Sequence, residues 1–350
     1  MTTAGWATVQ PGAGTAQHDN EDRDPRVDRM VRGGAFLLGD DGAEDVIWGE
    51  GECVAWAGGE SLMIYSSPGV GKTTLAGLLV RARLGLDDQV LGMPLRAGTN
   101  RVLYLAQDRP RQIARSLRRQ FSNNERSVLD ERLFVWRGPL IDDLVRAPTT
   151  FLDLARMANA DTVVVDSIKD VGLRIAEEAG GLSYNVARQH AVAEGVEMIE
   201  LHHARKATSE GRKTLTLDDV YGSTWLVGGA GSVIALNGDP SDTVIELRSM
   251  RMPRGELVLE IAVDREAGTM TATTRPTAVD ALRGQGSLLA KAVAQIIYGR
   301  DDVAKKEEMK VRRELSRGVE HGLVEEVPTM ARSGSRKQVA YRLADRKEAL

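Results

Sequence analysis

The chain has 350 residues, of which 42% are hydrophobic and 27% charged, and its formal net charge is −4. These values fit a soluble globular protein with a core of roughly 220 to 250 residues and a small module of about 60. The overall charge does not indicate nucleic-acid binding, so any basic surface must be local. The single cysteine, Cys53, excludes an intramolecular disulfide framework and a multi-cysteine metal site. We expect it to be a small buried or half-buried residue.

Hydropathy gives no sign of a membrane segment. No apolar run approaches the length needed to cross a bilayer, and no signal-peptide core follows Met1. The expectation is a cytoplasmic protein that does not engage a membrane.

The first 60 residues contain little regular pattern. Residues 1–28 are polar and without periodicity, which predicts a flexible arm. Residues 29–60 hold short apolar pieces separated by Gly and Asp, which predict short strands and turns leading into a core.

From residue 61 the pattern alternates between strands and helices, which predicts an α/β fold with a mostly parallel sheet and right-handed crossovers. The run DTVVVD at 161–166 is typical of a strand buried on both faces. The predicted strands are 61–65, 101–106, 133–136, 161–166, 196–203, 232–237, 243–250, 257–264 and 269–274, the later ones in part antiparallel, and the predicted helices are 72–84, 111–121, 149–158 and 184–194.

A second, smaller unit is predicted after this core. Helices over 287–298 and 303–322 precede two short strands, 323–327 and 338–344, which suggests a winged helix-turn-helix. The predicted domains are therefore an arm at 1–28, a nucleotide-binding core at 29–275, a linker at 276–286 and a winged helix-turn-helix-like unit at 287–350.

The stretch SSPGVGKTT at 66–74 is almost a phosphate-binding loop, with Ser66 where the first Gly is usual. It follows an apolar strand and opens a helix, so loop N–H groups and the positive helix end would hold phosphates. Lys72 should reach the β- and γ-phosphates, and Thr73 should bind Mg²⁺ together with Asp166 at the end of a buried strand. The predicted nucleotide-binding residues are Ser67, Pro68, Gly69, Val70, Gly71, Lys72, Thr73 and Thr74.

Five blocks occur in an order that resembles the RecA-like ATPases over about residues 45–275. They are PGVGKTTLA, VLYLAQDRP, VVVDSIKD, ELHHARKA and YGSTWLVGGAGSVIAL. The subgroup most similar to them is the RepA and DnaB-like hexameric helicase ATPases of phage and plasmid replication. The resemblance implies a RecA-like P-loop NTPase core that binds ATP and Mg²⁺, forms a homo-oligomeric ring, a hexamer in that group, and acts on DNA.

The resemblance also implies roles for residues at two further strand ends. Gln107 stands where the family usually has a Glu that polarises the attacking water, and Asp108 follows it. We expect Asp108 to take this role, with Gln107 as a water-orienting residue in a slower or inactive site as the alternative. Of the adjacent His202 and His203, which point to opposite faces of a strand, His203 is expected to sense the γ-phosphate.

Basic residues after these strands are candidates for contacts with DNA and with a neighbouring subunit. The polar loop after His203 would grip single-stranded DNA in a ring channel, unless it is simply a solvated loop, and 170–183 would be a second channel loop. Arg251 and Arg254 are the expected arginine fingers, which would complete a neighbour's ATP site. The candidate DNA-contacting residues of the first loop are Arg205, Lys206, Arg212 and Lys213.

Residues 303–350 carry 12 Lys/Arg and 8 Asp/Glu, a net charge of +4 in a chain whose total is −4. In a winged helix, the polar face of the helix at 310–322 would enter a major groove and the wing would touch phosphates, although such modules also bind proteins. The candidate residues are Arg312, Arg313, Arg317, Arg336 and Lys337.

Three functions follow from these patterns. The first is an ATP-dependent DNA motor of the replicative helicase type, acting as a ring on single-stranded DNA. The second is a DNA-binding regulatory or assembly ATPase without unwinding activity, and the third is a RecA-like recombinase. Gln107 and the acidic net charge slightly favour the second.

Overall fold

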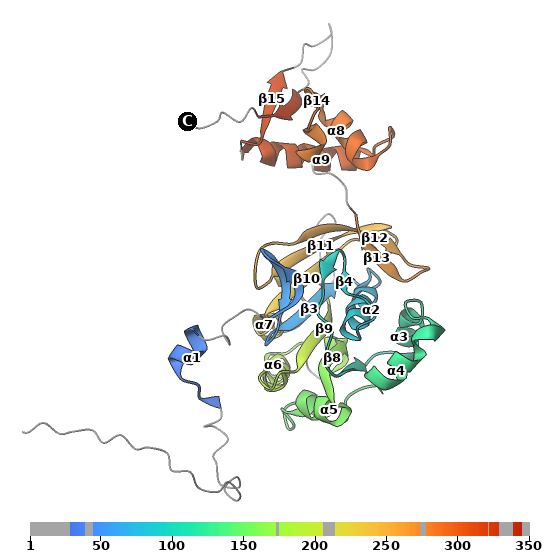
Figure 1. The fold of residues 1–350 in the computed structure, drawn as a ribbon, viewed down its shortest axis with the longest axis vertical. Helices are drawn as coiled ribbons and strands as arrows, with labels where there is room; N and C mark the ends of the chain where they lie inside the picture. The colour runs from blue at the N-terminus through green and yellow to red at the C-terminus, as the bar shows by residue number, and fades with distance from the viewer. Residues whose placement is uncertain are drawn as a thin grey trace, which may run out of the picture.

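The structure is a computed structural model, and it describes residues 29–38, 45–172, 175–205, 214–273, 278–320, 322–328 and 339–344. Its main feature is a nine-stranded sheet with the order β13-β12-β11-β10-β3-β9-β8-β6-β7 (Figure 1). The strands are β3 (Ser61–Ser66), β6 (Arg101–Ala106), β7 (Leu133–Arg137), β8 (Ala160–Asp166), β9 (Glu197–His203), β10 (Ser232–Asn237), β11 (Val244–Arg251), β12 (Val258–Asp264) and β13 (Thr269–Ala272).

Six neighbouring strands, from β10 to β7, are parallel, whereas β11, β12 and β13 extend the sheet as antiparallel strands. This confirms the predicted α/β class and the mostly parallel sheet with later antiparallel strands. The phosphate-loop strand β3 lies in the interior of the sheet, where all six of its residues are buried. Parallel strands covered on both faces read as continuous apolar runs, which is why the sequence located them well.

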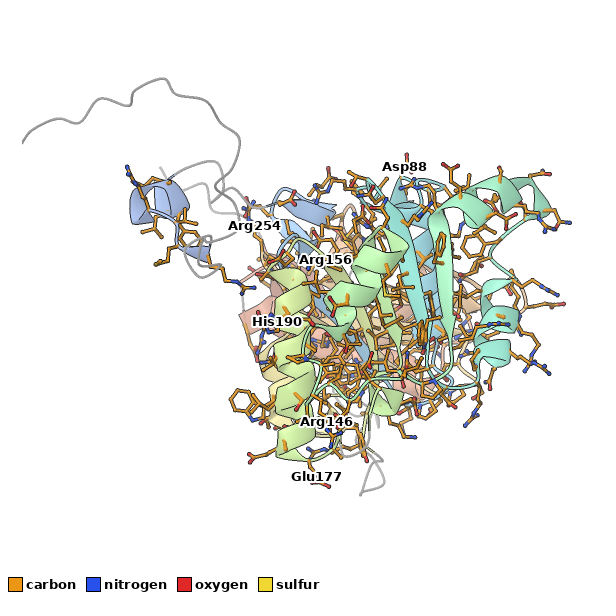
Figure 2. The ribbon with its side chains drawn as sticks, turned by 90° about the horizontal axis from the view of Figure 1, so that it is seen from below. Asp88, Arg146, Arg156, Glu177, His190 and Arg254 are labelled. Atoms are coloured by element: carbon orange, nitrogen blue, oxygen red, sulfur yellow. The ribbon has the colours of Figure 1, made fainter. Side chains whose placement is uncertain are left out.

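Helices cover both faces of the sheet. One core cluster joins α2 (Lys72–Arg83) and α3 (Pro110–Leu117) to the sheet. The other joins α5 (Thr150–Ala158), α6 (Glu178–Val192) and α7 (Thr224–Gly228) to the opposite face. Figure 2 shows α5 and α6 side by side, with Arg156 and His190 on their outer surfaces.

Alternation along each strand decides which face a side chain joins. On β6, Tyr104 and Ala106 lie in the α2 cluster, whereas Leu103 and Leu105 lie in the α5–α7 cluster. The same holds on β8, where Val164 belongs to the α2 face and neighbouring valines to the other. This alternation controls which residues beyond the strand ends face the phosphate loop.

Several local predictions were wrong. The piece GGAFLL forms an exposed helix, α1 (Gly33–Leu38), instead of a strand. The helix predicted at 111–121 ends at Leu117 and is followed by a separate α4 (Arg126–Arg132), introduced by a capping box between Ser122 and Glu125 in the short 3-10 turn Asn123–Glu125. Capping by short polar side chains overrode the weak apolar period there.

The predicted second channel loop is only partly a loop. Helix α6 begins at Glu178, six residues before the predicted start, and includes Gly180 and Gly181. A side chain at Gly181 would lie 2.5 Å from the Ser223 Cβ, so glycine permits close packing of α6 against the start of α7. Of this segment, Leu173 and Arg174 lie outside the described residues.

Two small hairpins lie beside the core. Strands β1 (Val46–Glu50) and β2 (Cys53–Ala57) confirm the short strands predicted before residue 60, and Cys53 is half-buried as expected. The hairpin of β4 (Gln89–Val90) and β5 (Met93–Pro94) was not predicted, because two-residue strands leave no readable period.

The C-terminal elements form their own core and lie apart from the large sheet in Figure 1. They are β14 (Leu288–Leu289), α8 (Ala290–Tyr298), α9 (Lys305–Glu320), β15 (Val324–Pro328) and β16 (Val339–Leu343), with the sheet order β14-β16-β15. Ala278, Ala281 and Leu282, from the segment predicted as a linker, pack into this core through the turn Asp280–Leu282. The element order is the one expected of a winged helix, which remains a prediction. None of the helices in the described ranges is both long and apolar enough to cross a membrane.

Candidate nucleotide site

The carboxyl ends of the central parallel strands meet at one edge of the sheet. Ser66 at the end of β3 is paired in register with His203 at the end of β9. Asp166 at the end of β8 lies opposite Leu201 of β9 on one side and Ala106 of β6 on the other. In open α/β sheets, ligands bind at this edge.

The phosphate loop between β3 and α2 depends on two glycines with positive φ, 79° at Gly69 and 135° at Gly71. A Cβ on Gly71 would also lie 2.2 Å from the Met270 Cε of β13, so no other residue fits there. Among the described residues, no side chain caps the start of α2. Its first N–H groups therefore remain as donors for an anion, which the positive helix end also favours.

Ser66, in the position of the usual first Gly, does not disturb the loop. Its backbone belongs to β3, and its hydroxyl donates to the Ser67 carbonyl at 2.8 Å. The Lys72 ammonium donates to the Ser66 carbonyl and hydroxyl, both at 3.1 Å, and to the Ser67 carbonyl at 3.2 Å. Burial lowers the pKa of Lys72 to about 8, while the negative charge of Asp166 acts in the opposite direction.

Thr73 and Asp166, the predicted magnesium pair, are in direct contact. The Thr73 hydroxyl donates to Asp166 Oδ2 at 3.1 Å, and the Tyr104 hydroxyl donates to the same oxygen at 2.7 Å. Burial raises the pKa of Asp166, and the hydrogen bonds from Tyr104 and Thr73 and the charge of Lys72 oppose that shift. The carboxyl group is therefore held in place from two sides.

This donor set fits Mg²⁺ bound together with a nucleotide. Mg²⁺ keeps several waters and commonly takes one or two protein oxygens plus phosphate oxygens. A hydroxyl and one carboxylate, beside the free N–H groups of α2 and the ammonium of Lys72, supply that arrangement. In the described part of the chain there is no cluster of three or more His, Cys, Asp or Glu residues for a metal held by protein alone.

Gln107 and Asp108 lie in different surroundings. Gln107 extends the ladder beyond β6 through its N–H to the Asp166 carbonyl, and its side chain accepts from the Leu140 N–H at 3.0 Å. It is only 5% exposed and continues the Leu105 face, away from the phosphate loop. The Asp108 side chain is 50% exposed and pairs with Arg109 at 3.3 Å.

The two histidines of β9 point to opposite faces, as alternation predicts. The His202 ring lies in the core, with Nε2 2.5 Å from the Tyr221 carbonyl. His203 is near enough to Lys72, Asp108 and Asp170 for their charges to act on its pKa. Burial lowers the pKa of each ring to about 4, so both are neutral at neutral pH.

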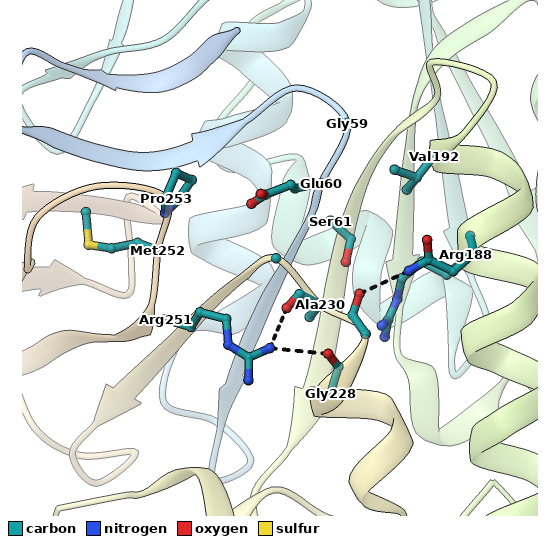
Figure 3. Close-up of a pocket in the computed structure, with 13 residues that line it drawn as sticks. Gly59, Glu60, Ser61, Arg188, Val192, Gly228, Ala230, Arg251, Met252 and Pro253 are labelled. Carbon is teal, nitrogen blue, oxygen red and sulfur yellow. Dashed lines mark hydrogen bonds between the residues drawn. The ribbon is translucent and has the colours of Figure 1, made fainter. Parts of the chain in front are cut away.

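Arg251 lies at the other edge of the sheet, in a cavity of about 530 Å³ that Ser61, the first residue of β3, also lines (Figure 3). One guanidinium nitrogen, Nη1, donates to the carbonyls of Val227, Gly228 and Ala230 at 3.1, 3.4 and 2.8 Å. A strand of this length separates Ser61 from the phosphate loop by about 17 Å. Arg251 is thus remote from the phosphate loop of its own subunit.

Arg254 follows on the same side of the fold. Its backbone bridges to Val54 of β2, and its side chain donates to the Gly51 carbonyl at 2.9 Å. Both predicted finger residues therefore rest on backbone carbonyls in this conformation.

The residues predicted to bind DNA are only partly described. Arg205 is exposed, and it donates to the carbonyls of Val220 and Gly222, each at 3.0 Å. On α9, Arg312, Arg313 and Arg317 are exposed on the face opposite Val311 and Leu315, and Arg312 pairs with Glu308 at 2.9 Å. Lys206, Arg212, Lys213, Arg336 and Lys337 lie outside the described residues.

Two residues at this edge were missed from the sequence. Tyr104 contacts Asp166 as described above, and Arg265 donates to the Gly69 carbonyl at 3.0 Å and to the Asp242 carbonyl at 3.0 Å. The face of Tyr104 was readable from alternation, since it lies two residues before the end of a parallel strand. Arg265 had no such signal, because the antiparallel extension brings it to the loop from almost 200 residues away.

Comparison with known proteins adds the family. Residues 53–209 match the family model described as AAA domain. No curated protein sequence matches the chain significantly. Among solved structures, the ATPase domain of a DnaB-like helicase is 13% identical, with a TM-score of 0.45 over 61% of this chain and 84% of that one. A KaiC-like protein from Pyrococcus horikoshii OT3 is also 13% identical, with a TM-score of 0.43 over 62% of this chain and 91% of that one. With the phosphate loop between β3 and α2, the sheet order around it and the match to the AAA domain, the chain is a RecA-like P-loop ATPase.

Proposed function

We propose that this protein is an ATP-dependent DNA motor of the replicative helicase type that works as a homo-oligomeric ring on single-stranded DNA. One observation carries the proposal. The helix start at Lys72, the contact between Thr73 and Asp166, and the neighbouring Asp108 and His203 gather at one edge of a RecA-like sheet.

The roles within the site follow from the surroundings of each side chain. The loop N–H groups and Lys72 bind the phosphates, and Thr73 and Asp166 hold Mg²⁺, which neutralises charge on the phosphate oxygens. Asp108, exposed and on the Tyr104 side of the sheet, polarises the attacking water. His203 is neutral at neutral pH, so it is able to hydrogen-bond a phosphate oxygen or the water without adding charge.

A ring is required if Arg251 acts in catalysis. The residue lies at the amino edge of the sheet, whereas its own phosphate loop lies at the carboxyl edge. Its guanidinium is therefore positioned to serve a neighbouring subunit and not its own. The same reasoning applies to Arg254, which follows at the same side.

The experiment is phosphate release with and without single-stranded DNA, together with sizing in the presence of ATP and Mg²⁺ and unwinding of a forked duplex. We expect DNA to stimulate hydrolysis, Lys72→Ala to abolish it, and nucleotide to promote a ring. Turnover that ignores DNA, together with an intact fork, would reject the motor.

A second candidate is a regulatory or assembly ATPase that binds duplex DNA and does not unwind it. Gln107 favours it, because its amide is committed to the Leu140 N–H and the site then depends on the exposed Asp108 alone. Slow hydrolysis with a footprint on duplex DNA would select this function. Strand exchange between homologous DNAs would instead select a recombinase.

A further inference from the structure

Tyr104 is a fully buried tyrosine on the face of β6 that looks toward α2. A phenylalanine would fill nearly the same volume without placing a hydroxyl in the core. The hydroxyl is not idle, because it donates to Asp166 Oδ2 at 2.7 Å. A buried hydroxyl that meets a buried carboxylate at this distance forms one of the stronger classes of hydrogen bond in proteins.

The two donors to Asp166 come from opposite elements and reach one oxygen. Tyr104 approaches from the sheet and Thr73 from the first turn of α2. Among the described residues, side-chain hydrogen bonds to this carboxyl group all end on Oδ2. Because an ionised carboxylate has two oxygens that accept, Oδ1 stays available while the plane of the group is fixed.

We propose that Tyr104 is a positioning residue for magnesium binding: its hydroxyl holds Asp166 in the orientation and the ionised form that a nucleotide-bound Mg²⁺ needs. Tyr104 does not touch the nucleotide in this scheme, and it acts only through Asp166. The inference rests on the proposed nucleotide site. It assigns to this chain a determinant of metal affinity that is separate from the phosphate loop.

The chain offers a closely matched control in Tyr184 on α6. It is also fully buried, and its hydroxyl donates to a buried carboxylate, Glu200 Oε1, at 2.8 Å. Glu200 lies on the other face of the sheet, where Arg188 also bonds the same oxygen. Tyr104→Phe and Tyr184→Phe therefore remove the same kind of bond from the same kind of surroundings, and only the first bond reaches Asp166.

The test is a titration of Mg²⁺ against binding of a fluorescent ATP analogue to the full-length protein, repeated in EDTA. For Tyr104→Phe we expect the half-saturating Mg²⁺ concentration to rise about tenfold, the lower end of what a hydrogen bond to a charged group contributes. Affinity in EDTA should stay within about twofold, which also reports an intact fold. Tyr184→Phe should leave the Mg²⁺ titration unchanged.

The outcomes separate this inference from the proposed function. If wild-type protein binds the analogue with a clear Mg²⁺ requirement and Tyr104→Phe titrates identically, the positioning role is wrong and the site stands. An equal shift in Tyr184→Phe would also overturn it, since a general loss of rigidity would then explain both. If the wild-type protein binds no nucleotide, the proposed function and this inference fail together.

Discussion

Exchanging the roles of Gln107 and Asp108 is the sharpest test of the catalytic site. Asp108→Asn keeps the size of an exposed side chain and removes its charge and basicity. Loss of a general base typically lowers kcat by 10² to 10⁴, or about 2.7 to 5.4 kcal/mol in the barrier. The stability of this variant should change by less than about 0.5 kcal/mol, because the lost ion pair with Arg109 is at the surface.

Gln107→Ala should behave in the opposite way. It removes the acceptor of the Leu140 N–H from a side chain that is 5% exposed, at a cost of about 1 to 3 kcal/mol in unfolding free energy. We expect kcat to stay within about threefold of the wild type. Gln107→Glu should not raise kcat, because the carboxylate would be buried on the wrong face of β6.

The assays are steady-state phosphate release at saturating ATP and Mg²⁺, nucleotide binding, and urea denaturation of the same three variants. The reasoning is refuted if Asp108→Asn turns over at the wild-type rate. It is equally refuted if Gln107→Ala loses a hundredfold in kcat while binding nucleotide and unfolding like the wild type.

Three other outcomes are expected. Arg251→Ala should lower hydrolysis by about 10³-fold without weakening nucleotide binding, and a mixture with Lys72→Ala subunits should exceed the summed phosphate release of the two variants alone. Arg188→Met should lower the unfolding free energy by about 3 to 5 kcal/mol in urea, because it leaves the fully buried Glu200 unpaired, and Glu200→Gln in the same chain should restore part of it. Burial raises the pKa of Glu197 from 4.5 to about 7. Its contribution is therefore complete below pH 4.5 and is lost as pH rises through 7, so wild type should lose about 3 kcal/mol relative to Glu197→Gln by pH 8 in denaturation curves.

The order of the predicted elements was read largely correctly because their signals are local. The bounds of β6 and β10 agree with the predicted strands, since buried parallel strands are apolar at every position. The helix after the phosphate loop begins at Lys72, as the loop motif requires. The errors fall where a short polar signal competes with a weak apolar period, as at Ser122 and Glu125, or where tertiary packing permits a glycine pair inside a helix, as at the start of α6.

The sequence by itself determined the phosphate loop, the strand that ends at Asp166, and the alternation that separates His202 from His203, because each depends on residues a few positions apart. Only the tertiary structure decided that Tyr104 reaches Asp166, that Arg265 braces the phosphate loop from the antiparallel extension, and that Gln107 is spent on Leu140. These contacts join strands and loops that are 33 to 196 positions apart. Strand order and register set them, and no local pattern of residue types encodes either.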